Sequence, residues 1–324
     1  MVESLDFNDT RKRGHPSWEK GAGLKLPKLP IPRPMHSFRG VTTRCVLLAS
    51  CLLSQLGCTK PETKYSATLE RASLMLLPFP TWNAGGAGRV QRVDLSATAT
   101  EKNKANFTAV RAEITPLYVV RLDDSHAVLL TQALPVGEGD QPYACHACAG
   151  TIGAYFFAHN AAGWRQTKRH DALATSGVEG NLGETSIAKL ADGHYAMTAE
   201  WGSCWQGYCG SWLVIAGLQA DTAVVLAPGL PLAADNDGAY GACSALDTPR
   251  DTDDKTEDNH ECLDIHSKWK FQGNRLVVTF EGRVTELGPD GKPGAAKRLH
   301  QQAVYEISPG QLRLVKGTNP VPNF

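Results

Sequence analysis

The chain has 324 residues, of which 42% are hydrophobic, so it holds apolar material for one large domain or two small ones. Its formal net charge is zero, but the first 58 residues carry nine Lys/Arg against four Asp/Glu. The remainder therefore has 24 basic and 29 acidic residues and a net charge of −5. A mildly acidic remainder without a Lys/Arg-rich segment lacks the electrostatic footprint of phosphate-backbone binding, so we expect no nucleic-acid partner.

The segment from Met35 to Cys58 has the anatomy of a signal peptide. Arg39 and Arg44 provide a positive start, and Cys45–Leu56 is an uncharged, mainly apolar run of twelve residues. Twelve helical residues rise only about 18 Å, which is too short for the roughly 30 Å hydrocarbon core of a bilayer. The pattern therefore predicts an export signal, residues 35–57, rather than a permanent transmembrane helix.

The end of this segment, Leu56-Gly57-Cys58, resembles the lipobox of bacterial lipoproteins, although Gln55 stands where that motif usually has an aliphatic residue. The run ending at Cys51 matches the motif better but leaves a much shorter apolar run before it, so Cys58 is preferred. The resemblance implies that Cys58 is lipidated and holds the protein on the periplasmic face of a membrane. Thr59 follows in place of a retention aspartate, which favours the outer membrane.

Two segments flank this signal. Residues 1–34 have no apolar periodicity and are either a disordered extension or the product of a gene start placed upstream of the true start at Met35, which we favour. Residues 58–107 are polar and rich in turn residues, so they are expected to form an irregular tether. Its apolar patch, Leu74–Leu77 with Phe79, fits either an edge strand or a short docking helix.

Residues 108–324 show short apolar runs separated by turn signals, which is typical of an all-β domain. Five hairpins are expected, at residues 117–130, 152–169, 194–216, 268–280 and 303–315. Residues 184–190 are expected to form one helical turn. Consecutive hairpins make an antiparallel meander, which must fold into a sandwich or a barrel-like domain to bury one face.

Six cysteines follow Cys58, and an even number in an exported chain predicts disulfides. Fifteen connectivities exist, but spacing favours three short-range pairs. They are Cys204 with Cys209 at a hairpin tip, Cys243 with Cys262 around a polar loop, and the remaining Cys145 with Cys148.

The motif Cys145-His146-Ala147-Cys148 has a known chemistry, because a CxxC pair can cycle between dithiol and disulfide. Thioredoxin-like proteins place a helix after this pair, whereas the residues that follow here favour a strand. A structural disulfide is therefore preferred, and a thiol–disulfide oxidoreductase is the alternative. A metal site with thiolate and imidazole ligands is the second alternative. The sequence does not place its further ligands, for which His126, His159, His170 and His194 are candidates.

Two other groups of residues have simpler interpretations. The acidic stretch between Asp235 and Asp264 fits no calcium-binding loop and is expected to be a solvated loop. Five aromatic residues around one hairpin are expected to be cross-strand core pairs rather than a sugar or peptide groove: Tyr195, Trp201, Trp205, Tyr208 and Trp212. The leading hypothesis is thus a membrane-anchored envelope lipoprotein with a binding or structural role, no enzyme activity, no cofactor and no bound metal.

Overall fold

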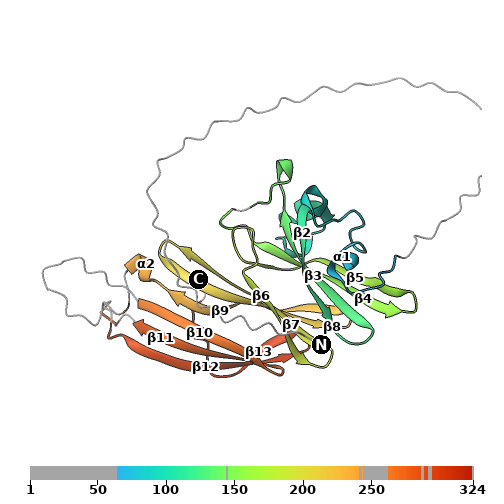
Figure 1. Ribbon diagram of the computed structural model, residues 1–324. Coiled ribbons are helices and arrows are strands. Elements are labelled where there is room, and N and C mark those ends of the chain that lie inside the picture. The colour runs from blue at the N-terminus through green and yellow to red at the C-terminus, as the bar shows by residue number, and fades with distance from the viewer. Residues whose placement is uncertain are drawn as a thin grey trace, which may run out of the picture. The chain divides into compact units, whose positions relative to one another are not determined.

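The computed structural model describes residues 64–143, 145–240, 243, 262–285, 288–290 and 294–322 (Figure 1). Residues 1–63, which include the predicted signal peptide and Cys58, lie outside the described residues. The described chain is all-β, as the turn spacing predicts, with two antiparallel sheets of five and eight strands. No helix in the described part is long and apolar enough to cross a bilayer.

The first sheet is a meander in the order β1-β2-β3-β4-β5. The expected hairpins at 117–130 and 152–169 are β2–β3 and β4–β5. Three 3-10 turns lie near its first strands and a fourth follows β3. The elements are β1 (Val90–Val93), β2 (Val110–Arg121), β3 (His126–Pro135), β4 (Gly150–Asn160), β5 (Gly163–Ser176), η1 (Gly86–Arg89), η2 (Ser96–Thr98), η3 (Lys104–Phe107) and η4 (Glu138–Asp140).

The second sheet has the order β13-β12-β11-β10-β9-β8-β7-β6 and contains the other three expected hairpins. A short helix, α2, follows β9. The elements are β6 (Glu184–Ala191), β7 (His194–Trp205), β8 (Tyr208–Gln219), β9 (Thr222–Asp235), α2 (Asp237–Tyr240), β10 (Cys262–Gln272), β11 (Arg275–Thr285), β12 (Lys297–Ser308) and β13 (Gln311–Lys316).

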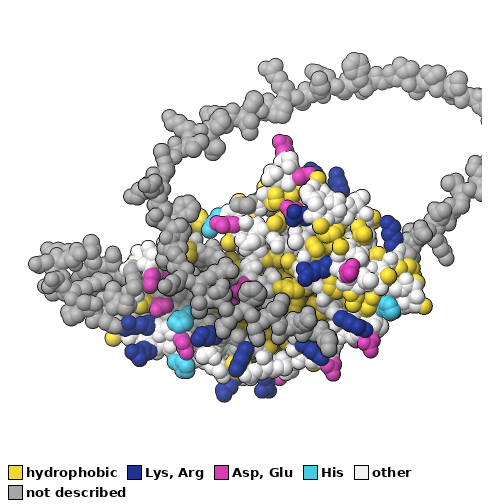
Figure 2. Space-filling model, viewed as in Figure 1, with side chains coloured by type: hydrophobic (Ala, Val, Ile, Leu, Met, Phe, Trp, Pro, Cys, Tyr) yellow, Lys and Arg dark blue, Asp and Glu magenta, His cyan; other side chains and the backbone are white. Residues whose placement is uncertain are grey.

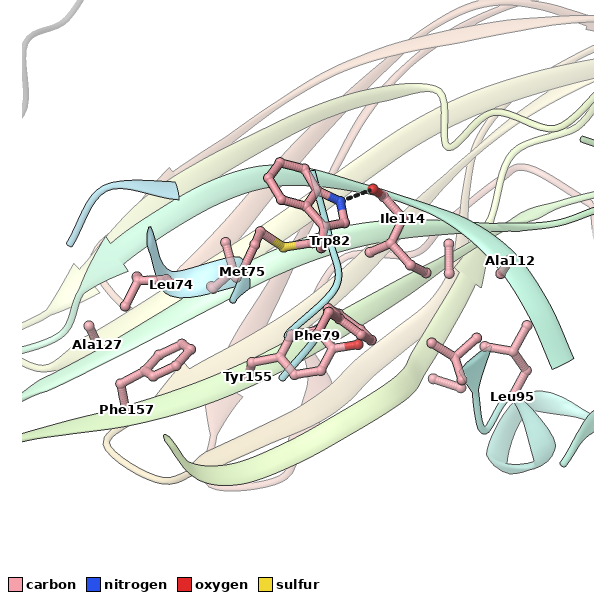
Figure 3. Close-up of a cluster of buried hydrophobic side chains, with 14 of the residues drawn as sticks. Leu74, Met75, Phe79, Trp82, Leu95, Ala112, Ile114, Ala127, Tyr155 and Phe157 are labelled. Carbon is pink, nitrogen blue, oxygen red and sulfur yellow. Dashed lines mark hydrogen bonds between the residues drawn. The ribbon is translucent and has the colours of Figure 1, made fainter. Parts of the chain in front are cut away.

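The expectation of an irregular tether over residues 58–107 is wrong for its described part, residues 64–107. This segment contains α1 (Arg71–Met75) and β1, and its apolar side chains form a core with one face of the first sheet (Figure 3). Trp82 donates its indole N–H to the carbonyl oxygen of Ile114 at 3.0 Å. The segment is polar on average, and only a few of its large apolar residues, such as Leu74, Phe79 and Trp82, pack on the sheet, so its composition did not predict the docking.

An ion pair between the buried Asp171 and the more exposed Arg169 fastens the same segment. Asp171 accepts hydrogen bonds from the Tyr155 hydroxyl at 2.8 Å, from Arg169 at 2.6 and 2.9 Å, and from the backbone N–H of Asp94 at 2.9 Å. Arg169 also donates to the carbonyl oxygen of Pro78. Every carboxylate oxygen of Asp171 is thus satisfied, which offsets the cost of burying its charge.

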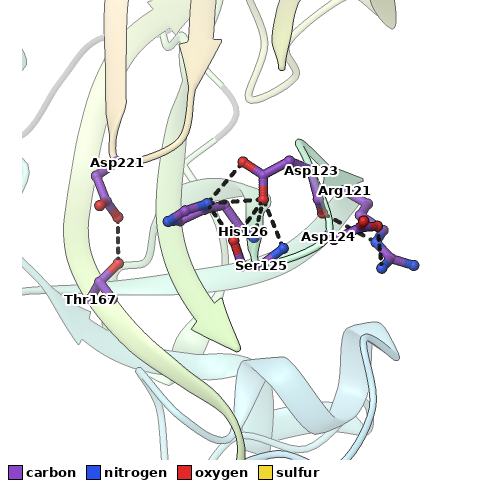
Figure 4. A network of polar contacts seen from close by, with 7 residues as sticks. All are labelled: Arg121, Asp123, Asp124, Ser125, His126, Thr167 and Asp221. Atoms are coloured by element: carbon purple, nitrogen blue, oxygen red, sulfur yellow. Dashed lines mark hydrogen bonds and ion pairs between the residues drawn. The ribbon is translucent and has the colours of Figure 1, made fainter. Parts of the chain in front are cut away.

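The opposite face of the first sheet packs on the second sheet. The shared core takes alternate residues from both, so that side chains such as Phe156 and Ile152 meet Met197, Val214 and Leu218. Each of the two sheets therefore buries one face in a common layer, as in a sandwich. At the margin of this layer the Thr167 hydroxyl donates to Asp221 at 2.8 Å and joins β5 to the β8–β9 turn (Figure 4).

The second sheet curls around a third core. Strand β9 pairs with β8 through three register irregularities and with β10 at Asp235 and Ala234 in the described register. Pro228 and Pro231 explain the irregularities in the register of β8 and β9, because proline cannot donate a hydrogen bond between strands and is confined to bulges and edges. The curl brings β6 and β7 toward β10, where the Trp269 indole donates to Glu200 at 2.8 Å.

The expected helical turn at residues 184–190 is wrong, because these residues form the edge strand β6. Their exposure alternates along the strand, and Ile187 packs against the shared core. The segment has few apolar residues, so the alternation of apolar and polar residues that indicates a strand is weak. Its strand conformation comes from pairing with β7 across the Asp192–Gly193 turn.

Candidate functional site

The Cys145-His146-Ala147-Cys148 loop lies between η4 and β4, and its two cysteines are bonded to each other. The N–H of Cys148 donates to the carbonyl oxygen of Cys145 at 2.8 Å, which closes a turn. The carbonyl oxygen of Cys148 accepts from the N–H of Gly180 at 2.8 Å, so the loop is fixed to the β5–β6 connection. A strand, β4, begins at Gly150, as the sequence predicts, and no helix follows the pair.

His146 contacts two neighbours from other elements. Its Nδ1 lies 3.5 Å from Oε1 of Glu179, and both side chains are about half exposed. Its ring stacks on that of Trp205, with centroids 5.9 Å apart and planes inclined by 29°. Sequence reasoning did not single out Glu179, because nothing in its turn-rich neighbourhood distinguishes it before the fold brings it to His146.

Trp205 lies at the tip of the β7–β8 hairpin, and its side chain is 66% exposed. The second disulfide, Cys204–Cys209, joins the two strands immediately behind it. Gln206 and Gly207 form the turn with positive φ values of 51° and 87°. A Cβ atom on Gly207 would collide with the backbone of Gly238 in α2, so glycine is required here for close approach as well as for φ.

The aromatic residues that the sequence groups around this hairpin separate into two kinds. Trp201 and Trp212 are directly opposite on β7 and β8 and stack at 4.6 Å, and Tyr195 packs against the shared core. These three fit the expectation of cross-strand core pairing. Trp205 does not, because it is exposed, and Tyr208 contacts Tyr240 of α2 edge-on at 5.9 Å.

The candidate histidine ligands are not brought to Cys145 and Cys148. His126 lies 2.9 Å from Asp123 in the β2–β3 turn, and His159 contacts the Trp164 ring at 4.8 Å. His170 packs edge-on against Phe156, and burial lowers its pKa. His194 begins β7. Among the described residues no group of three or more His, Cys, Asp or Glu side chains could hold a metal ion.

The acidic stretch is described only at its two ends, and residues 244–261 lie outside the described residues. At the near end, Asn236 is buried and accepts from the N–H of Leu263 at 2.9 Å, which ties α2 to β10. Burial and the neighbouring Asp237 and Asp264 raise the pKa of Asp235. The third disulfide, Cys243–Cys262, closes the segment at the start of β10.

Comparison with known proteins gives little. No protein-family description and no curated protein matches the chain. Two crystal structures of mutants of a B. megaterium levansucrase match at 14% and 13% identity, over 69% and 64% of this chain. The TM-scores are 0.24 and 0.23, and the match spans about half the length of those chains. Such a likeness carries no argument about activity.

What the site can do follows from its chemistry. A reactive CxxC thiol needs a lowered pKa, which a helix N-terminus or a cation beside the sulfur supplies. Here a strand follows the pair, and the His146 ring is engaged with Trp205 and Glu179. The arrangement is instead a fixed, exposed aromatic surface between two disulfide-bonded loops.

Proposed function

We propose that this protein is an exported envelope lipoprotein, anchored through acyl chains on Cys58, whose β domain binds a partner or ligand rather than catalysing a reaction. The anchor rests on the signal-peptide and lipobox-like pattern at residues 35–58. The binding role rests on one observation, the exposed stack of Trp205 on His146.

Three features of that stack support recognition. Trp205 and His146 present aromatic area and polar atoms together, which is the combination that binding surfaces favour. Each ring sits on a loop closed by its own disulfide, Cys145–Cys148 or Cys204–Cys209. A ring that is already ordered loses little conformational entropy on binding, so a rigid platform favours affinity.

The thiol–disulfide oxidoreductase is kept as the alternative, because the Cys145–Cys148 loop lies at the surface. The experiment is an insulin-reduction assay on the full chain, compared with a Cys145→Ser variant. We expect wild type and variant to be equally inactive, and the reduction potential of the pair to lie below about −300 mV, as for structural disulfides.

A matched control is the Cys204→Ala/Cys209→Ala variant, which removes the other short surface disulfide. If wild type and this control reduce insulin while Cys145→Ser does not, the binding interpretation is wrong and the oxidoreductase alternative is correct.

A further inference from the structure

A groove runs across the outer face of the second sheet, opposite its buried core. One row of directly paired residues reads Lys270, Val277, Val304 and Lys316 across β10, β11, β12 and β13. The two short valines lie between two long lysines, so the middle of the row is hollow. The groove encloses about 770 Å³.

The walls of this groove are cationic. Lys268, Lys270, Arg275 and Lys316 all line it, and none of them forms an ion pair with a carboxylate of the described residues. Glu306 lies opposite Arg275 on β12, but Arg313 binds it at 3.1 Å. Figure 2 shows Lys and Arg side chains along the lower edge of the molecule, over this part of the sheet. The groove therefore attracts anions.

Its width and its number of cations favour an extended occupant over a single small anion. Neighbouring strands are about 4.8 Å apart, so the backbones at Lys270 and Lys316 are separated by roughly 14 Å. A single phosphate held between these two lysines would leave Lys268 and Arg275 without an anion. An occupant with several negative groups along its length engages all four cations.

The floor of the groove indicates which part of the occupant lies between its negative groups. Val304 offers an apolar surface beside the buried Val277, and Thr279 and Gln302 in the next row offer hydroxyl and amide groups. A sugar ring has the matching pair of properties, because it presents C–H faces together with hydroxyl groups. A flat bilayer would leave the hollow unfilled. Trp269 borders the groove, but its indole is hydrogen-bonded to Glu200 and packs against the third core, so it offers nucleic-acid bases little stacking area.

We infer that this groove binds an acidic polysaccharide, with sugar rings over Val304 and the polar side chains beside it and anionic groups at the lysines of β10 and β13. This site goes beyond the proposed function, because it requires neither the anchor on Cys58 nor the Trp205 surface. It lies on strands that are separate from the CxxC loop, so the two can be tested independently.

The experiment is titration calorimetry of the full chain with dextran sulfate, with neutral dextran as the ligand control. We expect binding of dextran sulfate alone, weakened by added salt. The Lys268→Ala/Lys270→Ala/Lys316→Ala variant should bind about tenfold more weakly or worse, because three of its anion contacts are lost. A Lys64→Ala/Arg71→Ala/Lys102→Ala variant has the same change in charge at exposed positions outside the groove, and it should bind as wild type does.

Circular dichroism of both variants checks that the fold is retained. Equal weakening in the two variants, or no binding by wild type, would overturn the assignment, since binding would then depend on net charge or be absent. Tighter binding of phosphatidylglycerol vesicles or duplex DNA than of dextran sulfate, lost in the groove variant, would also overturn it.

Discussion

Asp123 organises the turn between β2 and β3. Its carboxylate accepts from the N–H groups of Ser125 and His126 at 2.7 and 2.8 Å and lies 2.9 Å from the His126 ring (Figure 4). These contacts, the N–H of Ser125 first, lower the pKa of Asp123 to about 2. The sequence predicts this turn from Asp123-Asp124-Ser125, although not the capping by the first aspartate.

Since the folded-state pKa lies below the usual 3.8, the stabilisation by Asp123 is present above about pH 4 and is lost as the pH falls through 2. We expect Asp123→Ala to lower the free energy of unfolding at pH 6 by about 1 kcal/mol, a small value because the side chain is exposed. Urea unfolding at pH 6 and pH 2.5 measures the difference. A deficit that is as large at pH 2.5 would show that the ionised carboxylate is not responsible.

Residues of the basic groove could not be predicted from sequence. Lys268 and Lys270 lie on β10, whereas Lys316 lies far along the chain on β13. A search for a Lys/Arg-rich segment therefore finds none, while strand pairing places these side chains in one groove. The prediction of no nucleic-acid partner, which rested on the absence of such a segment, stays a prediction. His146 and Cys145 could be identified from the sequence as candidate site residues, because the residues of their motif are adjacent in the chain.

The three disulfides join the predicted pairs of cysteines. These pairs could be predicted because the two cysteines of each pair are close in sequence. Turn residues likewise predict all five hairpins. Three strands, β1, β6 and β9, were not predicted. Strand β9 contains Pro228, Gly229 and Pro231, which local rules assign to turns, yet pairing with β8 keeps it extended by means of bulges.

The Cys243–Cys262 bridge encloses the longest loop, with a sequence separation of 19, against 5 and 3 for the others. Loop-closure entropy predicts that it contributes about 3 kcal/mol, and the shorter loops less. Urea unfolding of Cys243→Ala/Cys262→Ala should therefore show a larger loss than Cys145→Ala/Cys148→Ala. The reverse order would contradict the entropic explanation.

The whole domain was predicted to be a β-sandwich or barrel-like fold, and it combines the two features. The five-stranded sheet and the eight-stranded sheet pack face to face, and the second also curls around a core of its own. Local patterns show that strands exist but not where one sheet ends and the next begins. Here the break comes after Ser176, where Gly177, Gly180 and Gly183 with positive φ redirect the chain.

The packing of residues 64–107 against the first sheet also could not be predicted from local sequence patterns. Leu74, Met75, Phe79 and Trp82 are spread through a polar segment, and they become a core only because the first sheet presents a complementary apolar face. The first sheet is thus covered on both faces. This leaves the outer face of β10–β13 and the tip at Trp205 as exposed surfaces for binding.

The proposed role depends above all on export and lipidation, and intact mass spectrometry of the protein extracted from membranes tests both directly. We predict a mature chain that begins at Cys58 and carries the mass of two or three acyl chains. An N-terminus at Cys51 would move the anchor without changing the role. A chain that begins at Met1, or an unmodified chain that begins at Thr59, would contradict the account.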